Sequence, residues 1–104
     1  MTRLSQLQNL LAESPDDSFV RFALAKEYEK MGDEDKAFEF YNELLKKDPD
    51  YLGLYYHLGK WYERANDAER AVDIYSKGME VARQQGDQHA LGELAGARMM
   101  LADG

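Results

Sequence analysis

Apolar residues recur along this chain at the spacing that one face of an α-helix requires. One segment places Leu24 and Tyr28 on a common face, and the next segment does the same with Tyr41 and Leu44. No segment alternates apolar and polar residues as a half-buried β-strand would. The pattern therefore predicts an all-α fold of about six helices and no strands. We place these helices near residues 2–13, 17–31, 34–47, 51–65, 68–85 and 87–102.

The helix ends are marked by residues that interrupt a helix. Pro15 and Pro49 are the two prolines of the chain, and each favours the end of the helix before it because proline cannot continue a helix. Gly32 and Asn66 tolerate the left-handed backbone of a helix terminus, and the aspartate after each can cap the next helix. The connections are short, so we expect successive helices to pack antiparallel.

The chain also repeats itself at a spacing of 34 residues. The segment FALAKEYEKMGDEDKAFEFY begins at Phe22, and the segment YHLGKWYERANDAERAVDIY begins at Tyr56. The aligned pairs include Leu24 and Leu58, Lys26 and Lys60, Tyr28 and Tyr62, Glu29 and Glu63, Ala37 and Ala71, and Tyr41 and Tyr75. A fixed period of this length is typical of helical repeat arrays, in which neighbouring repeats bury one another's apolar faces.

The repeated motif resembles the tetratricopeptide repeat, whose signature runs W-x2-L-G-x2-Y and then Ala, an aromatic residue and Pro. In the second copy the matching residues are Tyr55, Leu58, Gly59, Tyr62, Ala71 and Tyr75. In the first copy they are Leu24, Ala25, Tyr28, Gly32, Ala37, Tyr41 and Pro49. The first copy has Arg21 where a bulky aromatic residue belongs, and the second has Arg83 in place of the closing proline. The resemblance implies antiparallel helical hairpins stacked as a short right-handed α-solenoid.

The resemblance extends over the whole chain, which we interpret as a single domain. We expect an N-terminal half-repeat helix in residues 1–15, a first repeat in 16–50, a second in 51–85 and a C-terminal capping helix in 86–104. Terminal repeats are usually atypical because they close the apolar faces that the inner repeats leave open.

Charge and composition narrow the classes of function. With 20 acidic and 13 basic residues the net charge is −7, which disfavours nonspecific nucleic-acid binding because phosphates need a basic surface. The same charge repels anionic membranes, and no apolar stretch approaches the ~20 residues of a spanning helix. The absence of cysteine excludes thiol catalysis and disulfides. We therefore expect a cytoplasmic protein that binds neither nucleic acid nor membrane.

The resemblance implies that the first helices of successive repeats line a concave groove for a partner. The residues on that face are Phe19, Phe22, Lys26, Glu29 and Lys30 from one helix, and Gly53, Tyr56, Lys60, Glu63 and Arg64 from the next. Each helix thus offers an aromatic ring followed by two bases, which favours a partner with carboxylates and an apolar anchor. The alternative is that these charges only form a solvated helix face with weak local pairs.

The predicted last helix has unusual features of its own. Gly92 and Gly96 lie one turn apart, with Met99 one turn further. Glycine in a helix interior costs about 1 kcal/mol relative to alanine. These positions therefore indicate close contact with a ligand or a second copy of the chain, or else a cap under little packing demand. His89 and Glu93 share a helix face, but two metal ligands do not complete a site.

No catalytic arrangement stands out in the sequence. There is no Ser/His/Asp set, phosphate-binding glycine loop or nucleotide fingerprint, so we expect no enzyme, no metal and no cofactor. The leading hypothesis is an adaptor that binds a peptide or helix of another protein. The partner is acidic if the bases of the groove face bind its carboxylates, and its charge is open if those bases only form a solvated face. The alternative is a self-assembling repeat protein that uses its last helix. The chain would then be a monomer in the first case and a weak homo-oligomer in the second.

Overall fold

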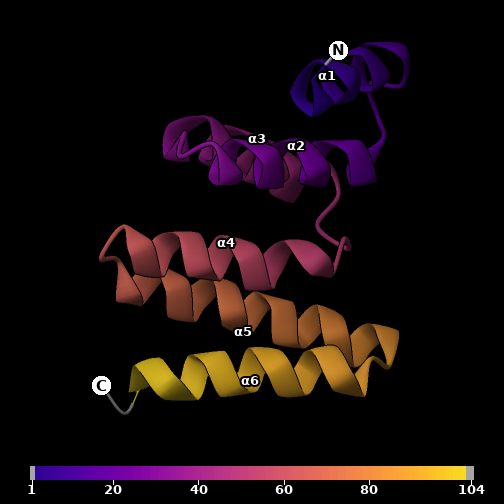
Figure 1. Ribbon diagram of the computed structural model, residues 1–104. Coiled ribbons are helices and arrows are strands. Elements are labelled where there is room, and N and C mark those ends of the chain that lie inside the picture. Colours follow the sequence, from indigo (N-terminus) through magenta and orange to yellow (C-terminus); the bar gives the residue numbers. More distant parts are fainter. Residues whose placement is uncertain (1, 103–104) are drawn as a thin grey trace. The chain divides into compact units, whose positions relative to one another are not determined.

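A computed structural model describes residues 2–102, which form six α-helices and no strand (Figure 1). The helices are α1 (Arg3–Glu13), α2 (Ser18–Lys30), α3 (Glu34–Lys47), α4 (Gly53–Arg64), α5 (Ala68–Gln85) and α6 (Gln88–Ala102). The predicted all-α helical repeat fold is therefore confirmed. Two compact units make up the chain, and they are divided between Tyr51 and Leu52. Within residues 2–102, no helix is both long enough and apolar enough to cross a membrane.

The helix ends follow the local chemistry of the sequence. Gly32 and Asn66 have positive φ angles of 82° and 60°, as their positions at helix ends predict. Asp33 and Asp67 then cap α3 and α5, and each carboxylate accepts the backbone N–H three residues further on, at 3.1 Å and 3.0 Å. These caps satisfy N–H groups that have no partner inside the helix.

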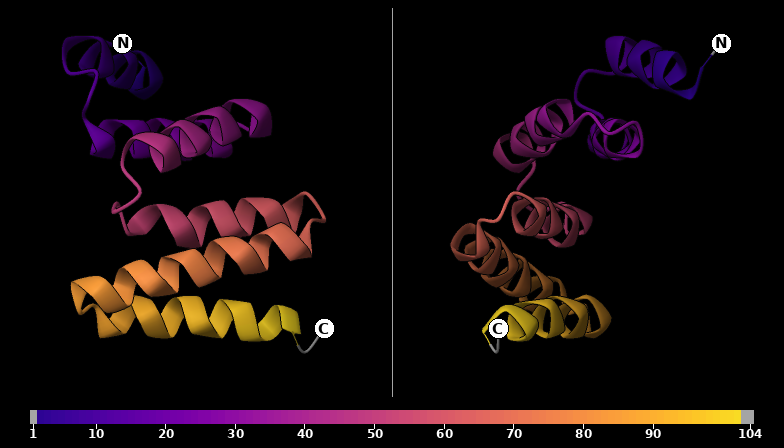
Figure 2. Two further views of the ribbon diagram at one scale, coloured as in Figure 1. Left: turned by 180° about the vertical axis from the view of Figure 1, so that it is seen from behind. Right: turned by 60° about the vertical axis from the view of Figure 1, so that its left-hand side comes forward.

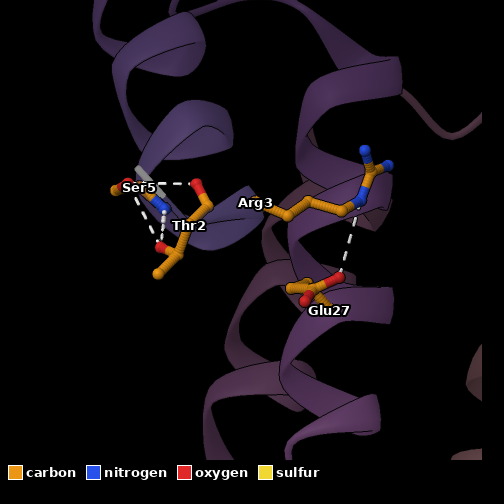
Figure 3. A network of polar contacts seen from close by, with 4 residues as sticks. All are labelled: Thr2, Arg3, Ser5 and Glu27. Carbon is orange, nitrogen blue, oxygen red and sulfur yellow. Dashed lines mark hydrogen bonds and ion pairs between the residues drawn. The ribbon is translucent and has the colours of Figure 1, made fainter.

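The first unit is built on the antiparallel pair α2 and α3. The residues at its centre are fully buried: Leu24, Ala25, Ala37, Tyr41 and Leu44. Helix α1 packs on α2 and contributes Leu7 to the buried set. Thr2 caps α1 by accepting the N–H of Ser5 at 3.1 Å, and Arg3 Nε lies 3.5 Å from Glu27 Oε2 of α2 (Figure 3). Gln8 Nε2 of α1 also donates to the hydroxyl of Tyr28 at 3.2 Å, so apolar burial, a hydrogen bond and an ion pair hold this terminal helix on α2.

Arg21 is a buried charge in the first unit. Its side chain lies in α2 and is 5% exposed, and its Nε donates to Glu43 Oε1 of α3 at 2.8 Å. The residue 34 positions further on is Tyr55, which is 2% exposed in the second unit. The position of Arg21 therefore remains buried although the residue departs from the repeat signature. A paired guanidinium takes the place of an aromatic ring.

The second unit consists of α4, α5 and α6, which lie side by side with successive helices antiparallel (Figures 1 and 2). Two glycines allow the helices to approach closely. A Cβ on Gly59 of α4 would overlap the ring of Tyr75 in α5, and a Cβ on Gly78 of α5 would lie 2.5 Å from the Cβ of Tyr55. Both tyrosines are buried, so each glycine makes room for a large ring of the facing helix.

Candidate functional site

The predicted aromatic residues of α2 have different surroundings. Phe19 is 62% exposed. Phe22 is half-buried, and its ring centroid lies 5.5 Å from that of Tyr51 and 6.4 Å from that of Tyr41. Phe22 therefore belongs to a cluster of rings that is fixed in position, and Phe19 projects into solvent.

The predicted bases and acids of α2 form a local network. Lys26 Nζ lies 3.6 Å from Glu29 Oε1, and the buried Tyr41 donates its hydroxyl hydrogen to the same oxygen at 2.7 Å. Lys30 is exposed one turn after Lys26. The carboxylate of Glu29 is thus held from both sides, and it orients the ammonium group of Lys26.

Helix α4 repeats this arrangement at the positions 34 residues further on. Lys60 Nζ lies 3.4 Å from Glu63 Oε2 and 5.4 Å from the centroid of the Tyr56 ring. Tyr75 donates its hydroxyl hydrogen to Glu63. Burial raises the pKa of the Tyr75 hydroxyl well above its usual value, and Glu63 raises it further. The aligned sequences contain every member of this network, but the link between the tyrosine and the glutamate was not predicted.

A cavity of about 240 Å³ lies within the second unit, between the first turn of α4 and the start of α6. It is lined by Leu52, Gly53, Tyr56, Asp87, His89, Ala90, Glu93 and Leu94. Gly53 and Tyr56 were predicted to lie on a binding face, whereas the part contributed by α6 was missed. The sequence holds no local signal for this cavity, because its two sides belong to α4 and α6, which α5 separates along the chain.

The remaining predicted residues of α6 lie in the open. A Cβ on Gly92 or Gly96 would meet no described heavy atom within 4 Å, and Met99 is 62% exposed. Their contact with a partner stays a prediction. His89 Nε2 lies 3.5 Å from Glu93 Oε1. Among the described residues, no group of three or more potential metal ligands is present.

Comparisons with known proteins identify the family. Residues 28–95 match the model of the tetratricopeptide repeat. The chain belongs to the tetratricopeptide repeat family. Members of this family are generally protein–protein interaction modules and non-enzymatic scaffolds.

Several solved structures resemble this chain over most of its length. The crystal structure of a tetratricopeptide repeat domain protein from Salinibacter ruber is 45% identical, covers 84% of this chain and 97% of its own, and has a TM-score of 0.80. A solution structure of a tetratricopeptide repeat domain protein from the same organism is also 45% identical, covers 85% of this chain and 89% of its own, and has a TM-score of 0.81. A solution structure from Bordetella parapertussis is 28% identical, covers 99% of this chain and 90% of its own, and has a TM-score of 0.83. No curated protein matches the chain.

Proposed function

We propose that this chain is an adaptor that binds a peptide or helix of another protein, and that the exposed face of α2 and the exposed face of α4 each provide a binding surface. One observation carries the proposal: each helix places an aromatic ring, a lysine and a glutamate in the same arrangement, tied to a buried tyrosine of the next helix. Tetratricopeptide repeats generally serve protein–protein interaction. Recognition in a groove needs apolar anchors and complementary charge but no catalytic group.

The geometry supports a partner that carries carboxylates. Lys60 is held between the ring of Tyr56 and the carboxylate of Glu63, so it has less side-chain freedom to lose when a ligand binds. An ammonium group has three N–H donors, and its pair with Glu63 leaves capacity for a second carboxylate. Because exposed ion pairs contribute only about 0.2–1 kcal/mol each, we expect the charges to select the partner and the apolar contacts to supply most of the affinity.

Charge reversal tests this proposal. The double variant Lys26→Glu/Lys60→Glu places a second negative charge beside Glu29 and beside Glu63, so its affinity for acidic peptides is expected to fall about tenfold or more. The control variant Lys36→Glu/Lys77→Glu makes the same change in net charge on α3 and α5 and should keep the original affinity. Calorimetric titration measures both. Unchanged affinity in the first variant would mean that these faces are not the binding site.

Self-assembly through α6 is a second candidate function, favoured by the exposure of its apolar residues. Met99 and Met100 are 62% and 77% exposed, and the open space at Gly92 and Gly96 lets another backbone approach. Association of two copies would remove the methionine side chains from water. Sedimentation at several protein concentrations tests this candidate. A molecular mass that stays at that of one chain throughout would eliminate it.

A further inference from the structure

The cavity of the second unit has the size of a site for one side chain. Its volume of about 240 Å³ is below the range of roughly 300–1,000 Å³ that is usual for small-molecule and cofactor sites. It is reached from the surface, because Gly53, Asp87 and His89 on its lining are exposed. We therefore consider a single side chain of a partner protein as its occupant.

The lining separates into an apolar floor and a polar rim. The floor, as we name the less exposed apolar part of the lining, consists of Leu94, which is 2% exposed, and the half-buried Leu52, Tyr56 and Ala90. This floor favours an apolar side chain, because each methylene group removed from water contributes about 0.8 kcal/mol. The exposed rim residues are Asp87, His89 and Glu93.

The rim is negative. Asp87 and Glu93 carry one carboxylate each, and no lysine or arginine is present among the described lining residues. His89 lies 3.5 Å from Glu93, and even a protonated imidazole would leave a net charge of −1 from these three groups.

The positive ends of two helices do not reverse this sign. Each helix N-terminus is equivalent to roughly half a positive charge, and its effect fades within one turn. Asp87 already accepts the N–H of Ala90 at 3.0 Å at the start of α6. Helix α4 begins after Leu52, whose side chain cannot accept a hydrogen bond. Its N-terminus therefore adds about half a positive charge, which is less than the negative charge of the two carboxylates. The rim therefore favours a cation.

We propose that this cavity binds an apolar side chain of a partner peptide whose neighbouring residue is a lysine or arginine paired with Asp87 and Glu93. The inference rests on the proposed function and specifies its ligand. Lys60, which we assign to a carboxylate of the partner, lies four residues beyond Tyr56 and seven beyond Gly53 on α4, or about 6 to 10 Å from these lining residues along the helix axis. An extended peptide covers that distance in about two to three residues. The preferred ligand thus has a base beside the apolar anchor and an acid two to three residues from it.

Blocked peptides of identical composition test the order of the charges. Lys-Leu-Ser-Ser-Glu and its reverse Glu-Ser-Ser-Leu-Lys place the base beside the anchor, whereas Glu-Leu-Ser-Ser-Lys and Lys-Ser-Ser-Leu-Glu place the acid there. Each peptide is titrated into the full chain while NMR monitors the backbone amides of the chain. This gives the affinity of each peptide and the location of its binding site. We expect the tighter peptide of the first pair to bind at least about fivefold better than either of the second pair. Amide shifts should centre on Gly53 and Ala90.

Two changes then test the separate parts of the cavity. Replacing the leucine of the peptide by alanine should weaken binding about tenfold, because the apolar floor loses its occupant. The variant Asp87→Asn/Glu93→Gln should reduce the preference for the first pair about threefold or more, leaving only the part that Lys60 contributes. Asparagine caps a helix as well as aspartate does, so α6 should be undisturbed. The control Asp73→Asn/Glu80→Gln removes two charges from α5 and should keep the preference.

The results separate this inference from the proposed function. Equal affinity for the two pairs of peptides, with shifts confined to the end of α4 near Lys60, would overturn the inference and leave the proposed function standing. Absence of binding by all four peptides at their solubility limit would also overturn it. The charge-reversal variants of Lys26 and Lys60 then decide the proposed function independently.

Discussion

At the scale of single residues, Arg21 shows how one repeat keeps a buried position with a different chemistry. Removing a guanidinium from water is costly unless a partner offsets the loss of hydration. Glu43 provides that partner at 2.8 Å, and its own side chain remains 42% exposed. The arginine therefore depends on Glu43 for its place in the core, whereas Tyr55 at the equivalent position of the second unit needs no ion pair.

This dependence predicts a conditional effect of Glu43→Ala. In the natural chain the substitution should lower the free energy of unfolding by about 1–3 kcal/mol, less than the ~3–5 kcal/mol of a fully buried pair because Glu43 is partly solvated. In an Arg21→Tyr background the same substitution should cost less than about 0.5 kcal/mol. Urea denaturation of the four proteins in this cycle measures the difference. Equal losses in both backgrounds would show that Glu43 does not stabilise the chain through Arg21.

The hydroxyl of Tyr75 predicts a loss of stability at high pH. Its pKa is raised in the folded chain, mainly by burial and then by Glu63, whereas an unfolded tyrosine ionises near pH 10. Above that pH the unfolded state binds fewer protons than the folded state, so the free energy of unfolding falls as pH rises, by up to about 1.4 kcal/mol per pH unit. Denaturation curves at pH 9 and pH 11 should show a smaller fall for Tyr75→Phe. A parallel fall in both proteins would contradict the assignment.

At the scale of helices, much of the fold follows from local signals in the sequence. The left-handed residues Gly32 and Asn66 and the caps Asp33 and Asp67 act where they were predicted. Helix α4 was expected from residue 51 but begins at Gly53. The residue before α4 is Leu52, whose side chain makes no capping hydrogen bond, so no residue type in the sequence marked this start.

The candidate site was less predictable than the helices. The lysine and glutamate positions could be placed on one face of α2, and separately on one face of α4, by helical spacing alone, because that spacing is local. The burial of Arg21 depends on Glu43 in another helix, and the cavity depends on how α6 packs beside α4. Such contacts are set by packing between helices, which the periodicity of one helix does not contain.

The glycines of the second unit predict opposite effects of one substitution. Gly92→Ala and Gly96→Ala should each raise the free energy of unfolding by about 0.5–1 kcal/mol, because both lie in the interior of α6 with open space around the added methyl group. Gly59→Ala should lower it by about 1–3 kcal/mol, because the methyl group overlaps the ring of Tyr75. Thermal and urea denaturation measure both. A loss of stability in the α6 variants would indicate that these glycines are already packed against another chain.

At the scale of the whole molecule, the charge distinguishes the two candidate functions. The net charge of −7 makes copies of the chain repel one another. Salt screens that repulsion and leaves apolar contacts intact, so it should favour association through Met99 and Met100. The same screening weakens the ion pairs that a bound peptide forms with Lys60 and with the rim residues Asp87 and Glu93. The two kinds of binding should therefore respond to salt in opposite directions.

Raising the salt concentration from 0.1 M to 1 M shortens the screening length from about 10 Å to about 3 Å. Over this range the affinity for a peptide with a base beside its anchor should fall several-fold, because each exposed ion pair contributes at most about 1 kcal/mol. If copies associate through α6, their association should instead become stronger. NMR titration measures the first quantity and sedimentation the second, with Met99→Ser/Met100→Ser as the variant that removes the apolar contact. Peptide affinity that is independent of salt would show that the assigned charges do not contribute to recognition. A single-chain mass at both salt concentrations would leave peptide binding as the function that the structure supports.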